Sequence, residues 1–126
     1  MKLTQLNHVA IQVADVSTSV AFYRDVLQLQ PLPRPAFSFP GAWFQLGVDQ
    51  ELHLIGDRQL GVVSQPRGNH YALLVDDIDA WEAYLQQNQV THLPRKTRPD
   101  GAFQIFLQDP DGHYIELCTP PGAAQA

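Results

Sequence analysis

The chain contains an internal repeat: Asn7–Val16 aligns with Asn69–Ile78 at a shift of 62 residues. Asn, His, Ala, Val and Asp fall at the same offsets in both segments, and most other positions are apolar in both. A repeat of this kind predicts two copies of one structural unit, each too small to stand alone. We expect unit 1 over about residues 5–60 and unit 2 over about residues 67–119, joined by a loop and followed by a short tail at 120–126.

The repeat continues beyond these two segments. Gly41–Trp43 aligns with Gly101–Phe103, and Leu52–Leu54 aligns with Ile115–Leu117, as the shift varies between 60 and 63. The 126 residues, of which 44% are hydrophobic, have the length and composition of one compact domain with a buried core. The two units are therefore expected to form a single domain over residues 1–126.

Each repeat shows the same order of elements. Stretches rich in Val, Ile and Leu at 6–13 and 69–75 are typical of strands. Asp15 or Ser17 in the first repeat, and Asp77 or Asp79 in the second, are N-cap residues that predict a helix after each strand. Three short strands are expected after each helix, near 30–38, 42–46 and 51–55, and near 90–95, 102–108 and 113–118, with a turn at 109–112. Each unit is therefore predicted to be β-α-β-β-β, an α+β fold.

The charge and cysteine content exclude several classes of function. A net charge of −5 argues against nucleic acid or an anionic membrane as the partner, because both attract basic surfaces. The single cysteine, Cys118, excludes an internal disulfide framework and any CxxC site. The longest apolar run, Tyr71–Val75, is far shorter than the roughly 20 residues of a membrane span, so we expect a soluble, cytoplasmic protein.

Four of the metal-capable side chains occupy equivalent positions in the two repeats. Alternate residues of a strand face opposite sides, so the apolar neighbours of these side chains are expected to pack under the helices. The four side chains then share the other face: His8, His53, His70 and Glu116. Three imidazoles and one carboxylate are a plausible set of ligands for a divalent ion, namely Zn, Ni, Mn, Fe or Co.

Each of these residues also has a structural interpretation. A single histidine on a strand is more often a structural residue than a ligand, and Glu116 could face solvent. The metal hypothesis rests on the equivalence of the positions in the two repeats rather than on any one residue. His92 and His113 have no repeat partner and are expected to be exposed, and Cys118 is expected to be a small, partly buried thiol.

The motifs together resemble the vicinal oxygen chelate superfamily, the fold of glyoxalase I, fosfomycin-resistance proteins and extradiol dioxygenases. The resemblance covers nearly the whole chain and is carried by Asn7–His8, Phe22–Leu27, Asn69–His70, Asp109–Gly112 and Ile115–Leu117. It implies an open, cup-like half-barrel sheet with helices on its outer face, and a homodimer that covers the open sheet edges. It also implies a divalent metal at His8, His70 and Glu116, with position 53 as a variable fourth ligand.

The resemblance implies an enzyme whose small substrate chelates the metal through adjacent oxygens. We expect a lyase or isomerase of the glyoxalase type, in which Glu116 or His53 serves as the catalytic base. The alternatives are an extradiol-type dioxygenase, a fosfomycin-type thiol transferase and a metal-free binding protein like the bleomycin-resistance proteins. Substrate contacts are expected from residues on the ligand face or in the loops above it: Gln12, Trp43, Arg98 and Gln104.

Overall fold

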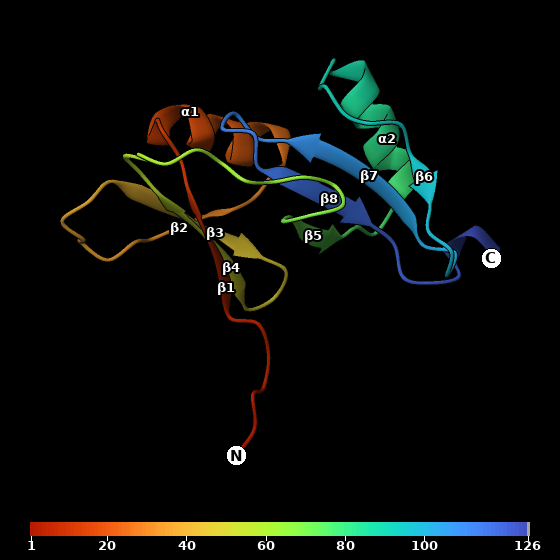
Figure 1. The fold of residues 1–126 in the computed structure, drawn as a ribbon, viewed down its shortest axis with the longest axis horizontal. Coiled ribbons are helices and arrows are strands. Elements are labelled where there is room, and N and C mark those ends of the chain that lie inside the picture. The colour runs from red at the N-terminus through yellow and green to blue at the C-terminus, as the bar shows by residue number, and fades with distance from the viewer. Residues whose placement is uncertain (126) are drawn as a thin grey trace. The chain divides into compact units, whose positions relative to one another are not determined.

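The computed structural model describes residues 1–125, which divide into two compact units, Met1–Gly61 and a second that begins at Val62. Within the described part of the chain, each unit carries one main helix and one open, four-stranded mixed sheet. This architecture confirms the predicted α+β class and the β-α-β-β-β order in both units (Figure 1). No helix among residues 1–125 is long and apolar enough to cross a membrane.

In unit 1, the sheet joins its first and last strands side by side. Strand β1 is parallel to β4, and β4 and β2 are antiparallel to β3, which gives the order β1-β4-β3-β2. A helix connects β1 to β2, and its last five residues are π-helical. The elements are β1 (His8–Gln12), α1 (Val16–Ala21) with its π-helical continuation η1 (Phe22–Val26), β2 (Pro31–Leu32), β3 (Gly41–Leu46) and β4 (Gln50–Ile55).

The helix of unit 1 begins at the predicted cap and covers one face of the sheet. The Asp15 carboxylate accepts a hydrogen bond from Thr18 N at 3.0 Å, which satisfies a donor that the first helical turn leaves free. The ring of Tyr23 lies 6.1 Å from that of Phe44 on β3, and both side chains are buried. The other buried apolar residues of this face are Val13, Leu27, Leu46, Leu52 and Leu54.

Unit 2 repeats this topology. Strand β5 is parallel to β8, and β8 and β6 are antiparallel to β7, so the sheet order is β5-β8-β7-β6. Asp77 caps the helix by accepting a hydrogen bond from Ala80 N at 3.0 Å. The elements are β5 (Tyr71–Leu74), α2 (Ile78–Gln87), β6 (Lys96–Thr97), β7 (Phe103–Gln108), β8 (Tyr114–Cys118) and a short 3-10 turn, η2 (Ala123–Gln125).

The predicted turn at 109–112 closes the last hairpin of unit 2. The buried Asp109 carboxylate accepts hydrogen bonds from Asp111 N and His113 N, both at 2.9 Å. Gly112 adopts a φ of 92°, a left-handed conformation that favours glycine. The Asp-Pro-Asp-Gly sequence therefore fixes the register that places Glu116 opposite Phe106.

The strand expected at 90–95 is wrong, because only a single bridge between His92 and Leu107 forms there. Pro94 has no backbone N–H to donate to a neighbouring strand, so a continuous ladder cannot cross it. The strand that does form, β6, lies just beyond, at Lys96–Thr97. The extended region at 30–38 is similarly reduced to Pro31–Leu32 by the prolines that follow.

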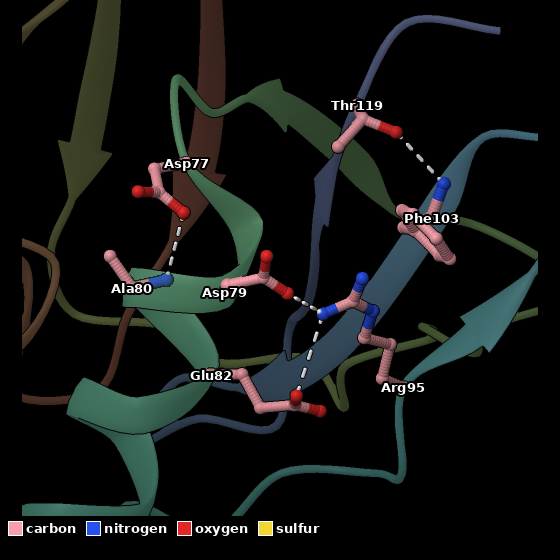
Figure 2. A network of polar contacts seen from close by, with 7 residues as sticks. All are labelled: Asp77, Asp79, Ala80, Glu82, Arg95, Phe103 and Thr119. Atoms are coloured by element: carbon pink, nitrogen blue, oxygen red, sulfur yellow. Dashed lines mark hydrogen bonds and ion pairs between the residues drawn. The ribbon is translucent and has the colours of Figure 1, made fainter. Parts of the chain in front are cut away.

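Arg95 connects α2 to β7 through ion pairs and a contact with an aromatic ring. Its guanidinium lies 2.5 Å from the Asp79 carboxylate and 3.5 Å from that of Glu82, and 3.9 Å from the centre of the Phe103 ring. Figure 2 shows both carboxylates pointing from the helix toward this arginine. The Thr119 hydroxyl accepts a hydrogen bond from Phe103 N at 2.8 Å beside it, so helix, β7 and the end of β8 are tied together.

The strand registers identify which positions are equivalent in the two units. Ala10, two residues after His8, pairs with His53, and Ala72, two residues after His70, pairs with Glu116. On the other side of these strands, Trp43 pairs with His53 and Phe106 pairs with Glu116. Trp43 therefore corresponds to Phe106, and the sequence alignment of Gly41–Trp43 with Gly101–Phe103 is wrong by three residues.

Candidate functional site

The ligand face of unit 1 carries a stack of three rings. His53 lies between His8 and Trp43, with ring centres 4.2 Å and 4.0 Å away and interplanar angles of 17° and 2°. The three residues come from three neighbouring strands, because β4 pairs with both β1 and β3. Face-to-face contact on both sides restricts rotation of the His53 ring.

Hydrogen bonds fix the orientation of both imidazoles in this stack. Nε2 of His53 lies 2.8 Å from Oε1 of Glu51, two residues earlier on the same strand face. Nδ1 of His8 lies 2.8 Å from Oδ1 of the preceding Asn7. Because these oxygens are acceptors, the paired nitrogens carry the protons, which leaves Nε2 of His8 and Nδ1 of His53 to accept.

The ligand face of unit 2 carries a pair of metal-capable side chains. Nε2 of His70 lies 3.1 Å from Oε1 of Glu116, and Nδ1 of His70 lies 3.1 Å from the carbonyl oxygen of Gly68. Glu116 is only 4% exposed, so its carboxylate has lost most of its water. The edge of Phe106 contacts the His70 ring, with ring centres 5.3 Å apart. Each ring of this cluster is thereby held against a neighbour.

Two cations lie on the same face of unit 2. Lys96 pairs with Gln104 on the neighbouring strand, and its Nζ lies 5.1 Å from the centre of the Phe106 ring. Arg98, two residues later, forms two hydrogen bonds to Asp100, at 2.8 and 2.6 Å. These hydrogen bonds raise the pKa of Arg98, and the negative charge of Glu116 raises it further. The predicted contact Arg98 is thus already paired with a carboxylate.

The Arg98–Asp100 pair should make stability depend on pH in a defined window. Hydrogen bonding to Arg98 lowers the pKa of Asp100 from 3.8 to about 2. A lowered folded-state pKa means that the pair stabilises the fold above about pH 4 and that this contribution is lost as pH falls toward 2. We expect Asp100→Asn to lower the thermal midpoint at pH 7 and to match the parent near pH 2, as measured by calorimetry. A midpoint difference that does not shrink below pH 4 would contradict this.

The other two predicted substrate contacts, Gln12 and Gln104, lie on the ligand faces of unit 1 and unit 2. Gln12 ends the ligand face of β1, opposite Ile55, and Gln104 lies opposite Cys118. Cys118 is buried, and burial together with the neighbouring Glu116 raises the pKa of its thiol. Both placements follow from the alternation of strand residues that the sequence already showed.

Three residues at the site were missed by the sequence interpretation: Glu51, Lys96 and Phe106. Glu51 precedes His53 by two residues, a spacing that places both side chains on one face and could have revealed the pair. Lys96 could not be assigned to a face, because the strand expected at 90–95 forms instead at Lys96–Thr97. Phe106 lies in the expected strand at 102–108, but its pairing with Glu116 depends on the register of β7 against β8. The structure also separates the basic cluster at 95–98, since Arg95 contacts carboxylates of α2 and Lys96 lies over the Phe106 ring.

The distance within the pair in unit 2 is that of a hydrogen bond and is also compatible with two ligands of one metal ion. Nitrogen and oxygen ligands at about 2.1 Å from one ion, at angles between 90° and tetrahedral, lie roughly 3.0–3.4 Å apart. The 3.1 Å separation between His70 and Glu116 falls in this range. The Gly68 carbonyl on Nδ1 of His70 is the type of outer contact that orients a metal-binding imidazole.

The pair in unit 1 fits a shared ion less well. The His8 and His53 rings are nearly parallel, so their planes meet well beyond the roughly 2 Å of a metal–nitrogen bond. His8 and His53 could therefore share an ion only if one of the two rings turned out of the stack. Among residues 1–125, no group of three or more His, Cys, Asp or Glu side chains is arranged to hold a metal ion. Within each unit, the structure therefore brings together one pair of predicted ligands: His8 with His53 in unit 1, and His70 with Glu116 in unit 2.

Comparison with known proteins gives matches over almost the full length. The sequence profile of the "Glyoxalase/Bleomycin resistance protein/Dioxygenase superfamily" matches residues 5–117. A lactoylglutathione lyase of Salmonella typhimurium is 31% identical, with 96% of each chain covered. The metallothiol transferase FosB of Staphylococcus epidermidis is 29% identical, with 94% of this chain and 84% of the relative covered.

The fold also matches a solved structure. A glyoxalase family protein from Bacillus anthracis superposes with a TM-score of 0.83, covering 94% of this chain and 97% of that one, at 22% identity. At this identity the match supports the fold alone. It agrees with the two open, four-stranded sheets described above.

Proposed function

Because this chain belongs to the glyoxalase/bleomycin resistance protein/dioxygenase superfamily, we propose that it is a metal-dependent enzyme of the glyoxalase type. Its substrate is a small, oxygen-rich molecule, and its reaction is that of a lyase or isomerase. The observation that carries this proposal is the His70–Glu116 pair, a buried carboxylate 3.1 Å from an oriented imidazole nitrogen. The 31% identity to a lactoylglutathione lyase supports the reaction class.

We assign His70, Glu116 and His8 as the ligands of one divalent ion, Zn, Ni, Mn, Fe or Co. The family resemblance adds His8 as the third ligand, and its Nδ1 is held by Asn7, which leaves Nε2 to bind. Such an ion supplies a Lewis acid that polarises a carbonyl and stabilises negative charge on a substrate oxygen. The homodimer expected from the open sheet edges stays a prediction.

His53 is proposed to move a proton rather than to bind the metal as a fourth ligand. Its Nε2–H donates to Glu51, so Nδ1 is the basic atom. A carboxylate on the far nitrogen stabilises the imidazolium that forms when Nδ1 takes a proton from a substrate carbon. Glu116 is the alternative base, since it is the other carboxylate at the proposed site.

The cations of unit 2 favour a substrate with negative charge. Lys96 lies over the Phe106 ring and makes no ion pair within 4 Å among the described residues, whereas Arg98 is neutralised by Asp100. A carboxylate or enolate on this face would therefore meet Lys96 first. The similarity to a metallothiol transferase supports thiol transfer to a small molecule as the second candidate reaction.

The proposal is tested by metal content and turnover. Protein purified without chelator should contain about one divalent ion per chain. Loss of an outer contact that only orients a ligand lowers metal affinity about 10–100-fold. Loss of a ligand itself should cost more, so His70→Ala should contain no metal. The metal-loaded parent should convert the hemithioacetal of methylglyoxal and glutathione. A parent protein that binds no divalent ion would overturn the enzyme proposal. Oxygen uptake on catechols would favour a dioxygenase, and thiol addition to fosfomycin a transferase.

A further inference from the structure

A continuous series of rings runs from a surface loop of unit 1 to His8. Phe39 stacks on Phe37 with centres 5.1 Å apart and planes inclined by 24°, and Phe37 lies 6.2 Å from Trp43. Trp43 in turn stacks on His53, which stacks on His8. The two phenylalanines lie between β2 and β3, in the segment 33–40. We call Phe37, Phe39 and Trp43 the aromatic surface.

The aromatic surface is unusually open for rings of this size. Phe37 is 45% exposed and Phe39 is 41% exposed, whereas Phe44, the residue after Trp43, is 1% exposed on the opposite face. Burial of apolar surface contributes roughly 25 cal/mol per Å² of favourable free energy, which these exposed rings do not gain. Adjacent, ordered and half-exposed rings are typical of a surface that another molecule covers.

Arg34 adds a positive charge and holds the two phenylalanines in place. Its guanidinium carbon lies 4.8 Å from the centre of the Phe37 ring and 4.9 Å from that of Phe39. Nη2 of Arg34 donates to the carbonyl of Phe39 at 2.9 Å. Nε is buried without a hydrogen-bond partner among the described residues, so the charge is incompletely compensated. The surface therefore combines two half-exposed rings with a cation.

We propose that the aromatic surface binds the ring of a small aromatic acid. This inference rests on the proposed function and names the substrate class for the same site. The ring stack makes the link, because it leads from the exposed phenylalanines through Trp43 and His53 to His8, a proposed ligand of the metal. The positive charge of Arg34 suits the anionic form of such an acid.

The occupant we commit to is a small molecule rather than a second copy of this chain. A second copy would explain why Phe37 and Phe39 are exposed. It would not explain why their rings are continuous with the stack that leads to His8. The cation is also better matched by a small acid than by an apolar patch, since a buried unpaired charge weakens a protein interface. A second copy at this surface would appear as a change in oligomeric state when the two phenylalanines are replaced.

The test compares probes that differ only in aromaticity. Trp81→Phe leaves Trp43 as the single tryptophan, so its fluorescence reports binding at the aromatic surface. The metal-loaded protein is titrated with mandelate and hexahydromandelate, which share the adjacent oxygens but carry a phenyl or a cyclohexyl ring. We expect mandelate to bind about 3- to 10-fold more tightly, the effect of one or two aromatic pairs. Phe37→Ala/Phe39→Ala should bring the two probes within about twofold of each other.

A second pair of probes separates this inference from the proposed metal site. Benzoate and cyclohexanecarboxylate lack the second oxygen and are titrated in the presence of chelator, so their ratio does not depend on metal. A preference for benzoate that the double variant removes supports the aromatic surface even if no metal binds. Leu60→Ala, which removes another exposed apolar side chain of unit 1, should leave both ratios unchanged.

Two results would overturn the inference. One is equal affinity for the phenyl and cyclohexyl probes in both pairs. The other is a preference for the phenyl probes that survives Phe37→Ala/Phe39→Ala. A double variant that changes the oligomeric state of a parent without phenyl preference would assign the surface to a second copy instead.

Discussion

Glu116→Gln should reduce divalent-metal affinity by more than about 100-fold, because removal of a ligand exceeds the 10–100-fold effect of losing an outer contact. The substitution keeps the size of the side chain but replaces one anionic oxygen with an amide that donates. Glu116 is 4% exposed and lies 3.1 Å from Nε2 of His70, so no water can take the place of the lost oxygen. Metal affinity is measured by titration with a metal-sensitive dye. Turnover should fall in proportion to the metal content.

Glu51→Gln is the matched control for this prediction. Glu51 also lies beside an imidazole, at 2.8 Å from Nε2 of His53, and on the equivalent face of the other unit. If His53 moves a proton rather than binding metal, Glu51→Gln should leave metal content unchanged and lower kcat alone. Equal loss of metal in both variants would contradict the assignment of His53, and retention of metal in Glu116→Gln would contradict the assignment of Glu116.

The repeat predicted the fold because each copy keeps its hydrophobic alternation. His8 and His70 open equivalent strands, and Ile115–Leu117 shows on its own which face Glu116 occupies. The cap residues Asp15 and Asp77 set the helix starts through their own side-chain hydrogen bonds, a local interaction that sequence reveals. Local signals of this kind were sufficient for the order of elements in both units.

The partners of the site residues could not be predicted in the same way. The stack of Trp43 on His53 depends on the register of β3 against β4, and the sequence had aligned Trp43 with the wrong residue of the second repeat. The short strand β6 has no alternation to recognise, so the side of the sheet that Lys96 faces was not visible. Contacts across strands depend on register, and a single residue of error reverses the face.

The largest effect on stability is expected from Phe44→Ala. Phe44 is 1% exposed on the helix-covered face of β3, and its ring lies 6.1 Å from that of the fully buried Tyr23. Loss of a buried phenylalanine side chain leaves a cavity and costs about 3–5 kcal/mol in the free energy of unfolding. For a chain of this length, we expect the thermal midpoint to fall by roughly 10–20 °C, as measured by circular dichroism.

Phe39→Ala provides the comparison within the same unit, since it removes the same side chain from a position that is 41% exposed. Its free energy of unfolding should change by no more than about 0.5 kcal/mol, as is usual for a surface site. The contrast follows from strand alternation, which directs Phe44 into the core while Trp43, its neighbour, stays on the ligand face with His53. Similar losses in both variants would mean that the segment carrying Phe37 and Phe39 belongs to the core, and its rings would then have no free face for a ligand.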